Sequence, residues 1–368
     1  MSFPLSRRML ITGALGALPM AKALAQAAPA PSAEAPGPLR LVANENPYGP
    51  SPAARQAVVE AAAQGWQYAF SEVGALAAAL AAHHGVPADH VVVTAGSVEA
   101  LRLAAMLWCA DGGNLVAAHP TFDVLPRYAE RLGCEGRRVP LDASMTHDLG
   151  AMAAAMDAET RLVYLCNPNN PTGTLLPAGA VRDFVAEISP RAPVVVDEAY
   201  LELQDDEGAH TAIERVLAGD RVVVLRTFSK LHGMAGLRVG YAIAPPDIAG
   251  RLEARRVSFM SRPGVMAALA SLADTEFQAF SRARIREAMA VTTGAFDALG
   301  LAYTPSHGNF DAVDTGVPVA EFSAAMRAQG ILTGRPVAGY PTWARISMGR
   351  VEDMHRLAGA MRSFLAPA

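Results

Sequence analysis

A lysine stands beside hydroxyl residues in one short segment near the middle of the chain. Thr227, Ser229 and Lys230 come at the end of an apolar run, and Arg238 follows eight positions after the lysine. A lysine amine can condense with an aldehyde to form a Schiff base. Hydroxyls together with a bidentate guanidinium suit a phosphate group. The segment therefore predicts a ligand that carries both an aldehyde and a phosphate. An ion pair elsewhere in the protein is the alternative for Arg238.

A second segment predicts further contacts to a phosphate. Gly96, Ser97 and Val98 follow the apolar run 91–94, and the pattern opens a helix at about Val98. Glycine permits a tight turn, and free backbone N–H groups at the start of a helix attract phosphate. Taken alone, this segment is more typical of an ordinary capped helix start that binds nothing.

Two further segments supply polar groups that suit an aromatic ring. Asp197 ends an apolar run, and a carboxylate there needs a partner such as a protonated pyridine nitrogen. Tyr200 and Asn170 can hydrogen-bond to a phenolate oxygen. The alternatives are a helix cap for Asp197, a turn without a ligand around Asn170, and Glu198 as the paired acid. Adjacent side chains at a strand end point in opposite directions, which disfavours Glu198. Together the segments predict pyridoxal phosphate as the cofactor.

The elements that must position these residues follow from the apolar runs. Such runs alternate with helical patterns, and five of them cover 91–94, 114–117, 162–165, 194–197 and 222–225. Runs of this length suit strands buried on both faces, and their alternation with helices indicates a parallel sheet. Ligands bind beyond the carboxyl ends of such strands. The predicted fold class is α/β, a mostly parallel central sheet flanked by helices, with a smaller α+β domain.

The N-terminus has the pattern of an export signal. Arg7 and Arg8 precede an apolar stretch from Leu10 to Met20, and the small residues Ala23-Leu24-Ala25 then offer a cleavage site. This pattern is typical of a twin-arginine signal, which transports folded proteins. An ordinary secretory signal or an uncleaved anchor is the alternative. We therefore expect a periplasmic or exported protein, and a cytoplasmic one if the signal does not function.

The remaining divisions follow from composition. The predicted parts are a signal peptide at 1–25, a linker at 26–38, an N-terminal segment at 39–65 that packs with the small domain, a large cofactor-binding domain at 66–265 and a small domain at 266–368. After the N-terminus no apolar run is long enough to span a membrane.

Composition argues against several classes of protein. The 368 residues are 51% hydrophobic and carry a net charge of −4, without a basic stripe, so nucleic-acid binding is not expected. Cys109, Cys134 and Cys166 are widely spaced and odd in number, which predicts buried thiols rather than disulfides. No metal site is expected, because no C-x-x-C is present and His83-His84 lacks companion ligands.

Six motifs in order resemble a known family. They are Asn-Glu-Asn-Pro-x-Gly-Pro at 44–50, A-G-S-V-E at 95–99, N-P-N-N-P-T-G at 167–173, D-E-A-Y at 197–200, S-K-x-x-G-M-A-G-L-R at 229–238 and R-I-S-M-G at 345–349. Together they resemble fold-type I, class I/II aminotransferases, in particular the histidinol-phosphate aminotransferase branch. The resemblance implies a Schiff base at Lys230, a ring-nitrogen partner at Asp197 and stacking of Phe122 on the cofactor ring.

The resemblance also implies how substrates bind. Arg345 matches the arginine that grips the substrate α-carboxylate, and Asn44 belongs to the first motif. Arg335 is the local candidate for holding a substrate phosphate. Tyr68 matches a tyrosine that reaches the neighbouring subunit's phosphate, which implies a homodimer.

The implied function is transfer of an amino group to a 2-oxo acid such as 2-oxoglutarate by a ping-pong mechanism. The donor is an amino acid or a phosphorylated amine that resembles histidinol phosphate. The alternatives are a decarboxylase, racemase or oxidase on the same fold, or an exported binding protein without catalysis.

Overall fold

The computed structural model describes residues 37–365. The predicted signal peptide and nearly all of the predicted linker lie outside these residues. From Pro38 onward the chain forms one compact unit. Across the described part, no helix combines the length and the apolar character needed to cross a membrane.

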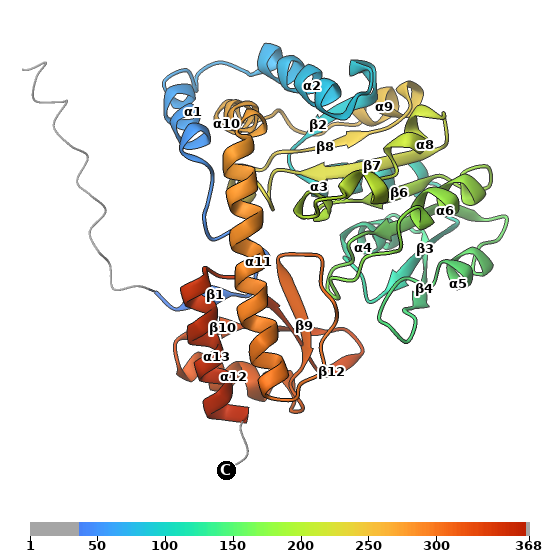
Figure 1. Ribbon diagram of the computed structural model, residues 1–368. Coiled ribbons are helices and arrows are strands. Elements are labelled where there is room, and N and C mark those ends of the chain that lie inside the picture. Colours follow the sequence, from blue (N-terminus) through green and yellow to red (C-terminus); the bar gives the residue numbers. More distant parts are fainter. Residues whose placement is uncertain (1–36, 366–368) are drawn as a thin grey trace, which may run out of the picture. The chain divides into compact units, whose positions relative to one another are not determined.

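A seven-stranded sheet forms the centre of this unit (Figure 1). Its strand order is β2-β8-β7-β6-β5-β3-β4, and only β8 runs antiparallel to its neighbours. The strands are β2 (Val91–Thr94), β3 (Asn114–His119), β4 (Glu135–Pro140), β5 (Thr160–Cys166), β6 (Val194–Asp197), β7 (Val222–Thr227) and β8 (Gly240–Ile243). The five predicted runs correspond to β2, β3, β5, β6 and β7, and the predicted fold class is confirmed.

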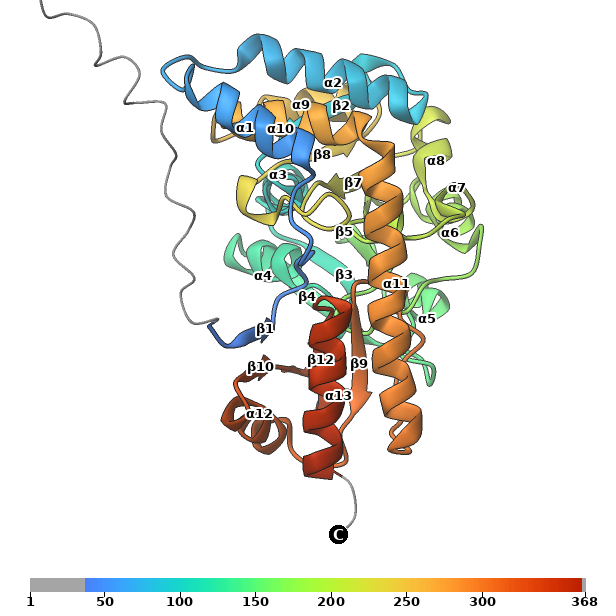
Figure 2. The ribbon, with the colours of Figure 1, turned by 60° about the vertical axis from the view of Figure 1, so that its left-hand side comes forward.

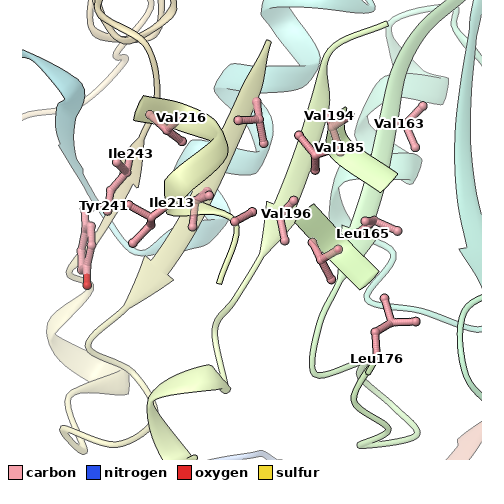
Figure 3. Packing of buried hydrophobic residues seen from close by; sticks show 14 of the residues in the cluster. Val163, Leu165, Leu176, Val185, Val194, Val196, Ile213, Val216, Tyr241 and Ile243 are labelled. Atoms are coloured by element: carbon pink, nitrogen blue, oxygen red, sulfur yellow. The ribbon is translucent and has the colours of Figure 1, made fainter. Parts of the chain in front are cut away.

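Successive side chains of each strand point to opposite faces of the sheet. Helices cover both of these faces. Val194 and Val196 pack in one cluster, drawn in Figure 3, and Val195 packs in the other. The first cluster is covered by α2 (Phe70–His84), α5 (Leu149–Ala154), α6 (Ala180–Ile188), α8 (Ile213–Leu217) and α10 (Arg262–Ala273). The second is covered by α3 (Ser97–Trp108), α4 (Val124–Arg131) and α9 (Pro246–Glu253). Short helical turns are η1 (Ala88–His90), α7 (Glu207–His210), η2 (Leu201–Leu203) and η3 (Ala235–Leu237).

The C-terminal part has its own small sheet and core. The antiparallel order β11-β12-β9 packs beside α11, α12 and α13, and Figure 2 shows α13 and α11 side by side. Its core includes Phe296, Phe322 and Ile346. The elements are β9 (Phe310–Asp314), β10 (Ile331–Thr333), β11 (Arg335–Val337), β12 (Tyr340–Ser347), α11 (Thr275–Ala298), α12 (Val319–Ala328) and α13 (Val351–Leu365).

The N-terminal segment divides between two neighbours. β1 (Leu39–Leu41) pairs in parallel with β10, so it joins the C-terminal part. The helix α1 (Pro52–Ala62) packs instead against α10, which contributes Val265 to the core of the large sheet. The limits of the two domains stay a prediction.

A carboxyl group in the C-terminal part is buried without a partner. Asp311 lies on β9 opposite Ile346 of β12 and is fully inaccessible to solvent. Among residues 37–365, neither of its carboxyl oxygens has a hydrogen-bond partner. Burial raises the pKa of Asp311 to about 7, because an ion is poorly solvated there.

This side chain makes the stability of the protein depend on pH. An unfolded aspartate has a pKa of about 3.9, so the folded state binds the proton more tightly. The resulting stabilisation is complete below about pH 4 and is lost as the pH rises to about 7, a difference of about 4 kcal/mol. We expect Asp311→Asn, which cannot ionise, to be the more stable protein at pH 8 by about 2–4 kcal/mol.

Urea unfolding at pH 5 and pH 8 measures the effect. Asp183→Asn, on the exposed face of α6, is the matched control and should follow the wild type at both values. An Asp311→Asn protein whose stability changes with pH as much as the wild type would contradict the prediction.

Candidate active site

A cavity of about 270 Å³ opens at the carboxyl ends of the parallel strands. The loops that follow β2, β3, β5, β6 and β7 all contribute side chains to it, as expected for a parallel sheet. The lining residues are Val42, Ala43, Asn44, Glu45, Ser97, Val98, Phe122, Cys166, Asn170, Asp197, Ala199, Tyr200, Thr227, Ser229, Lys230, Ala235, Arg238, Arg335 and Arg345.

One end of the cavity has the groups that bind a phosphate. The Thr227 hydroxyl donates to Ser229 Oγ over 2.9 Å, and Arg238 Nη1 lies 3.4 Å from the same oxygen. α3 begins at Ser97, and across the described chain no side chain caps its first turn. Gly96 has φ +79°, and a Cβ there would collide with the Arg238 guanidinium. The positive φ favours glycine, and a side chain there would displace the Arg238 guanidinium from the helix start, where an anion is stabilised.

Asp197 and Lys230 also line the cavity. Asp197 is only 1% exposed, and its carboxylate accepts hydrogen bonds from the Tyr164 hydroxyl (3.3 Å) and the Ala199 N–H (3.2 Å). Burial raises the pKa of Asp197 to about 6. Lys230 Nζ donates to the Asn44 carbonyl over 2.8 Å, and burial lowers its pKa to about 8. At neutral pH a useful fraction of this amine is therefore unprotonated.

Tyr200 lines the same cavity and contacts two asparagines and Lys230. Its hydroxyl accepts hydrogen bonds from Asn44 Nδ2 (2.9 Å) and Asn170 Nδ2 (3.4 Å). Lys230 Nζ lies 5.1 Å from the centre of the Tyr200 ring. The two asparagines come from segments far apart in sequence, so the position of this hydroxyl is set by the tertiary structure.

Arg345 and Arg335 lie opposite each other across the β11–β12 ladder. Arg345 donates to Asn170 Oδ1 (3.0 Å) and to the Val42 carbonyl (2.8 Å), while its Nε is buried without a partner. Within residues 37–365, no carboxylate lies at ion-pair distance from either guanidinium. Two arginines whose charge is not compensated favour an anionic substrate.

The acid next to Asp197 lies outside the cavity. Glu198 pairs with Arg226, both fully buried, so Asp197 is the carboxylate that faces Lys230. Within the described chain, no carboxylate lies at ion-pair distance from Arg238, in contrast to the ion-pair alternative considered for it. All three cysteines are buried and free, as predicted.

Two predicted site residues, Tyr68 and Gly96, are absent from the lining of the cavity, and of these Gly96 adjoins the lining residue Ser97. Tyr68 lies elsewhere. It is 67% exposed and packs with Phe70 and Phe259 on the surface. The sequence did not predict that Tyr164 would contact Asp197 or that the buried Cys166 would line the cavity. Both lie within the apolar strand β5, and nothing in such a run distinguishes a side chain that faces a ligand from one that fills the core.

The donor set fits pyridoxal phosphate. An amine of lowered pKa, a buried carboxylate and a phosphate cradle occur together in one cavity. They match the aldehyde, the ring nitrogen and the phosphate of that group. A side chain at position 96 would displace the Arg238 guanidinium from this cradle.

Comparison with known proteins identifies the family of the chain. The profile of the family "Aminotransferase class I and II" matches residues 36–361. The chain belongs to this family. It is a transaminase whose cofactor is pyridoxal 5′-phosphate.

The most similar relatives include histidinol-phosphate aminotransferases. The histidinol-phosphate aminotransferase 2 of Ralstonia nicotianae is 40% identical, over 90% of this chain and 89% of the relative. The protein of the same name from Pseudomonas aeruginosa is 38% identical, over 89% of each chain. The crystal structure of histidinol-phosphate aminotransferase from Sinorhizobium meliloti in complex with pyridoxal-5′-phosphate has a TM-score of 0.82 and 32% identity, covering 88% of this chain and 91% of that one.

Proposed function

We propose that this transaminase moves an amino group from an anionic amino acid, or from a phosphorylated amine that resembles histidinol phosphate, to a 2-oxo acid such as 2-oxoglutarate. The transfer follows a ping-pong course, in which the donor leaves before the acceptor binds. The observation that carries the proposal is the pair of uncompensated guanidinium groups of Arg335 and Arg345 at the cavity. The names of the relatives are consistent with a phosphorylated donor.

Different residues of the cavity would hold different parts of the cofactor. When bound, pyridoxal 5′-phosphate supplies a reactive aldehyde and a ring that accepts electrons. Ser97, Val98, Thr227, Ser229 and Arg238, with Gly96 leaving space for them, would hold its phosphate. Asp197 would hold the ring nitrogen in its protonated form, and Phe122 would stack on the ring. Asn170 and Tyr200 would hold the ring oxygen.

Lys230 is the residue that we infer to move the proton. Its Nζ, at a pKa of about 8, takes the proton from the substrate Cα as a general base and later returns one as a general acid. Arg345 holds the substrate α-carboxylate, so that the Cα stays within reach of this nitrogen. Asn44, which donates to the Tyr200 hydroxyl, lines the substrate cavity with it.

We expect the loss of Arg345 and the loss of Arg335 to slow different sets of amino donors. We expect Arg345→Ala to slow the reaction of every amino acid, because each carries an α-carboxylate. We expect Arg335→Ala to slow glutamate, which has a side-chain carboxylate, and histidinol phosphate, which has a phosphate, by about 100-fold and to leave alanine unaffected, since a charge-assisted contact is worth about 1.5–3 kcal/mol. The measurement is the spectral change of the bound cofactor with glutamate, histidinol phosphate and alanine in turn, followed by addition of 2-oxoglutarate.

Arg127→Ala is the control for these variants. Arg127 is exposed near the cavity mouth and pairs with Asp123, so its loss should leave all three donors unaffected. Equal losses for alanine and glutamate in Arg335→Ala would refute the proposed preference. No spectral change with any anionic donor would refute the proposed substrate class.

We also propose that the protein forms a homodimer in which Tyr68 serves the neighbouring subunit. In support, Tyr68, Phe70 and Phe259 form an aromatic surface cluster, and Trp66 close by is 81% exposed. A cluster of this kind is typical of a protein interface. Analytical ultracentrifugation tests the assembly, and a monomer at micromolar concentration would rule out the proposal.

For localisation, we propose export by the twin-arginine route, in support of which stand Arg7, Arg8 and the apolar stretch that follows. Cell fractionation of an Arg7→Lys/Arg8→Lys variant tests this, because the paired arginines identify the route. Unchanged export of the variant would exclude the twin-arginine route, and a wild-type protein found only in the cytoplasm would show that the signal does not function.

A further inference from the structure

An ion pair is buried directly behind the cavity, on the side of β6 and β7 away from it. Glu198 follows β6 and is 0% exposed, and Arg226 lies on β7 and is 1% exposed. Arg226 Nε and Nη2 both lie 2.8 Å from Glu198 Oε2. The function described above does not use either residue.

Further contacts extend this pair into a network. The carboxylate of Glu198 accepts from the Thr211 hydroxyl (2.8 Å) and the Ala212 N–H (2.8 Å). Arg226 Nη1 pairs with Glu207 Oε2 over 2.8 Å. A single guanidinium therefore connects the ends of two strands with the segment around α7. We call Glu198, Arg226, Glu207 and Thr211 the clamp.

Stability alone does not explain such an arrangement. Removing two charges from water is costly, and apolar residues of similar size often replace a buried ion pair with no loss of stability. The neighbours of the pair in sequence point to another role. Glu198 follows Asp197, and Arg226 precedes Thr227, so each member of the pair adjoins a residue of the cavity.

We propose that Glu198 and Arg226 are positioning residues for the cofactor site. The inference rests on the roles proposed for Asp197 and Thr227. The backbone N–H of Glu198 donates to the Leu225 carbonyl over 2.9 Å, and the side-chain pair adds a second connection between the same strand ends. With both ends held, Asp197 and Thr227 keep a constant spacing across the cavity.

The charges of Glu198 and Arg226 also affect the protonation of Asp197. A carboxylate at position 198 raises the pKa of Asp197, beyond the larger effect of burial. Arg226 offsets this charge from inside the protein, where the interaction is weakly screened. Loss of the guanidinium would therefore favour protonation of Asp197 and weaken its hold on a positively charged ring nitrogen.

Arg226→Lys is the first test. Lysine keeps the positive charge, but its single ammonium cannot hold Glu198, Glu207 and Thr211 together. We expect the apoprotein to unfold at nearly the wild-type temperature. We expect the dissociation constant for pyridoxal 5′-phosphate to rise about 10- to 100-fold, by analogy with the loss of a residue that orients a metal ligand. The kcat should fall with it, while the KM for the donor changes little.

Glu198→Leu/Arg226→Met is the second variant. It removes both charges together, so no buried charge is left without a partner and the fold should be kept. Arg215→Lys is the control, because Arg215 also pairs with an acid, Asp220, but lies on α8 away from the cavity. It should bind the cofactor as the wild type does.

Absorbance titration of each apoprotein with pyridoxal 5′-phosphate, beside thermal unfolding without it, separates the outcomes. Weaker cofactor binding at an unchanged apoprotein unfolding temperature supports the positioning role. Wild-type affinity in either folded variant overturns it, and so does a loss of affinity that only follows a loss of stability. A wild-type protein that fails to bind the cofactor covalently at Lys230 would instead refute the proposed site, so the two failures are distinguishable.

Discussion

Replacing Lys230 by alanine is expected to lower the rate of transamination by at least about 10⁴-fold, because the variant loses both the amine that binds the cofactor and the general base. Pyridoxal 5′-phosphate should still enter the cavity, since Ser229 and Arg238 remain to hold its phosphate. We therefore expect a protein that binds the cofactor reversibly and does not turn over. The measurements are the steady-state rate with glutamate and 2-oxoglutarate, and the absorbance spectrum after dialysis.

The small number of lysines in the chain makes the site of covalent cofactor attachment easy to identify. Lys22 and Lys230 are the only lysines among the 368 residues, and Lys22 lies in the predicted signal peptide. Borohydride reduction of the cofactor-bound protein followed by peptide mapping should label Lys230 and no other side chain. A label on any other residue, or a Lys230→Ala protein with more than a trace of activity, would contradict the proposed role.

The second large effect is expected at Asp197. Asparagine has the same shape but carries no charge, so Asp197→Asn could no longer stabilise a protonated ring nitrogen. We expect kcat to fall by about 10³-fold, within the range seen when an electrostatic contact to developing charge is removed. Affinity for the cofactor should fall as well, because the buried carboxylate would lose its charge-assisted bond to the ring.

The control for this variant is Asp123→Asn. Asp123 lies near the cavity mouth, is partly exposed and pairs with Arg127, so its charge acts mainly in solvent. It should keep wild-type turnover and cofactor affinity. A wild-type kcat in Asp197→Asn would show that another acid stabilises the protonated ring nitrogen. Glu198 is held by Arg226 on the far side of the strands and could not take it without rearrangement.

The location of the functional site could be predicted from local motifs, because these motifs occur at the ends of the predicted strands. Lys230, Asp197 and Asn170 each follow a strongly apolar run, and the structure brings the three together. The reason is geometric: the carboxyl ends of parallel strands meet at one edge of the sheet. A resemblance in six ordered motifs then indicated the family, which the comparisons confirm.

Two strands of the sheet could not be recognised in this way. β4 is an edge strand rich in charged residues, since part of it faces solvent and apolar side chains are not required there. β8 lies between β2 and β7 and runs antiparallel to both. Its place depends on long-range pairing, which the short segment Gly240–Ile243 does not encode by itself.

The sequence by itself determined five strands of the central sheet, the chemical groups at their ends and the family. The tertiary structure alone decided which distant segments complete the site: it brings Asn44 and Arg345 to Tyr200 and Asn170, places Tyr68 on the surface, and pairs Glu198 with Arg226. The physical reason is that apolar runs and turns are governed by neighbours along the chain, whereas contacts between polar side chains depend on how separate elements pack.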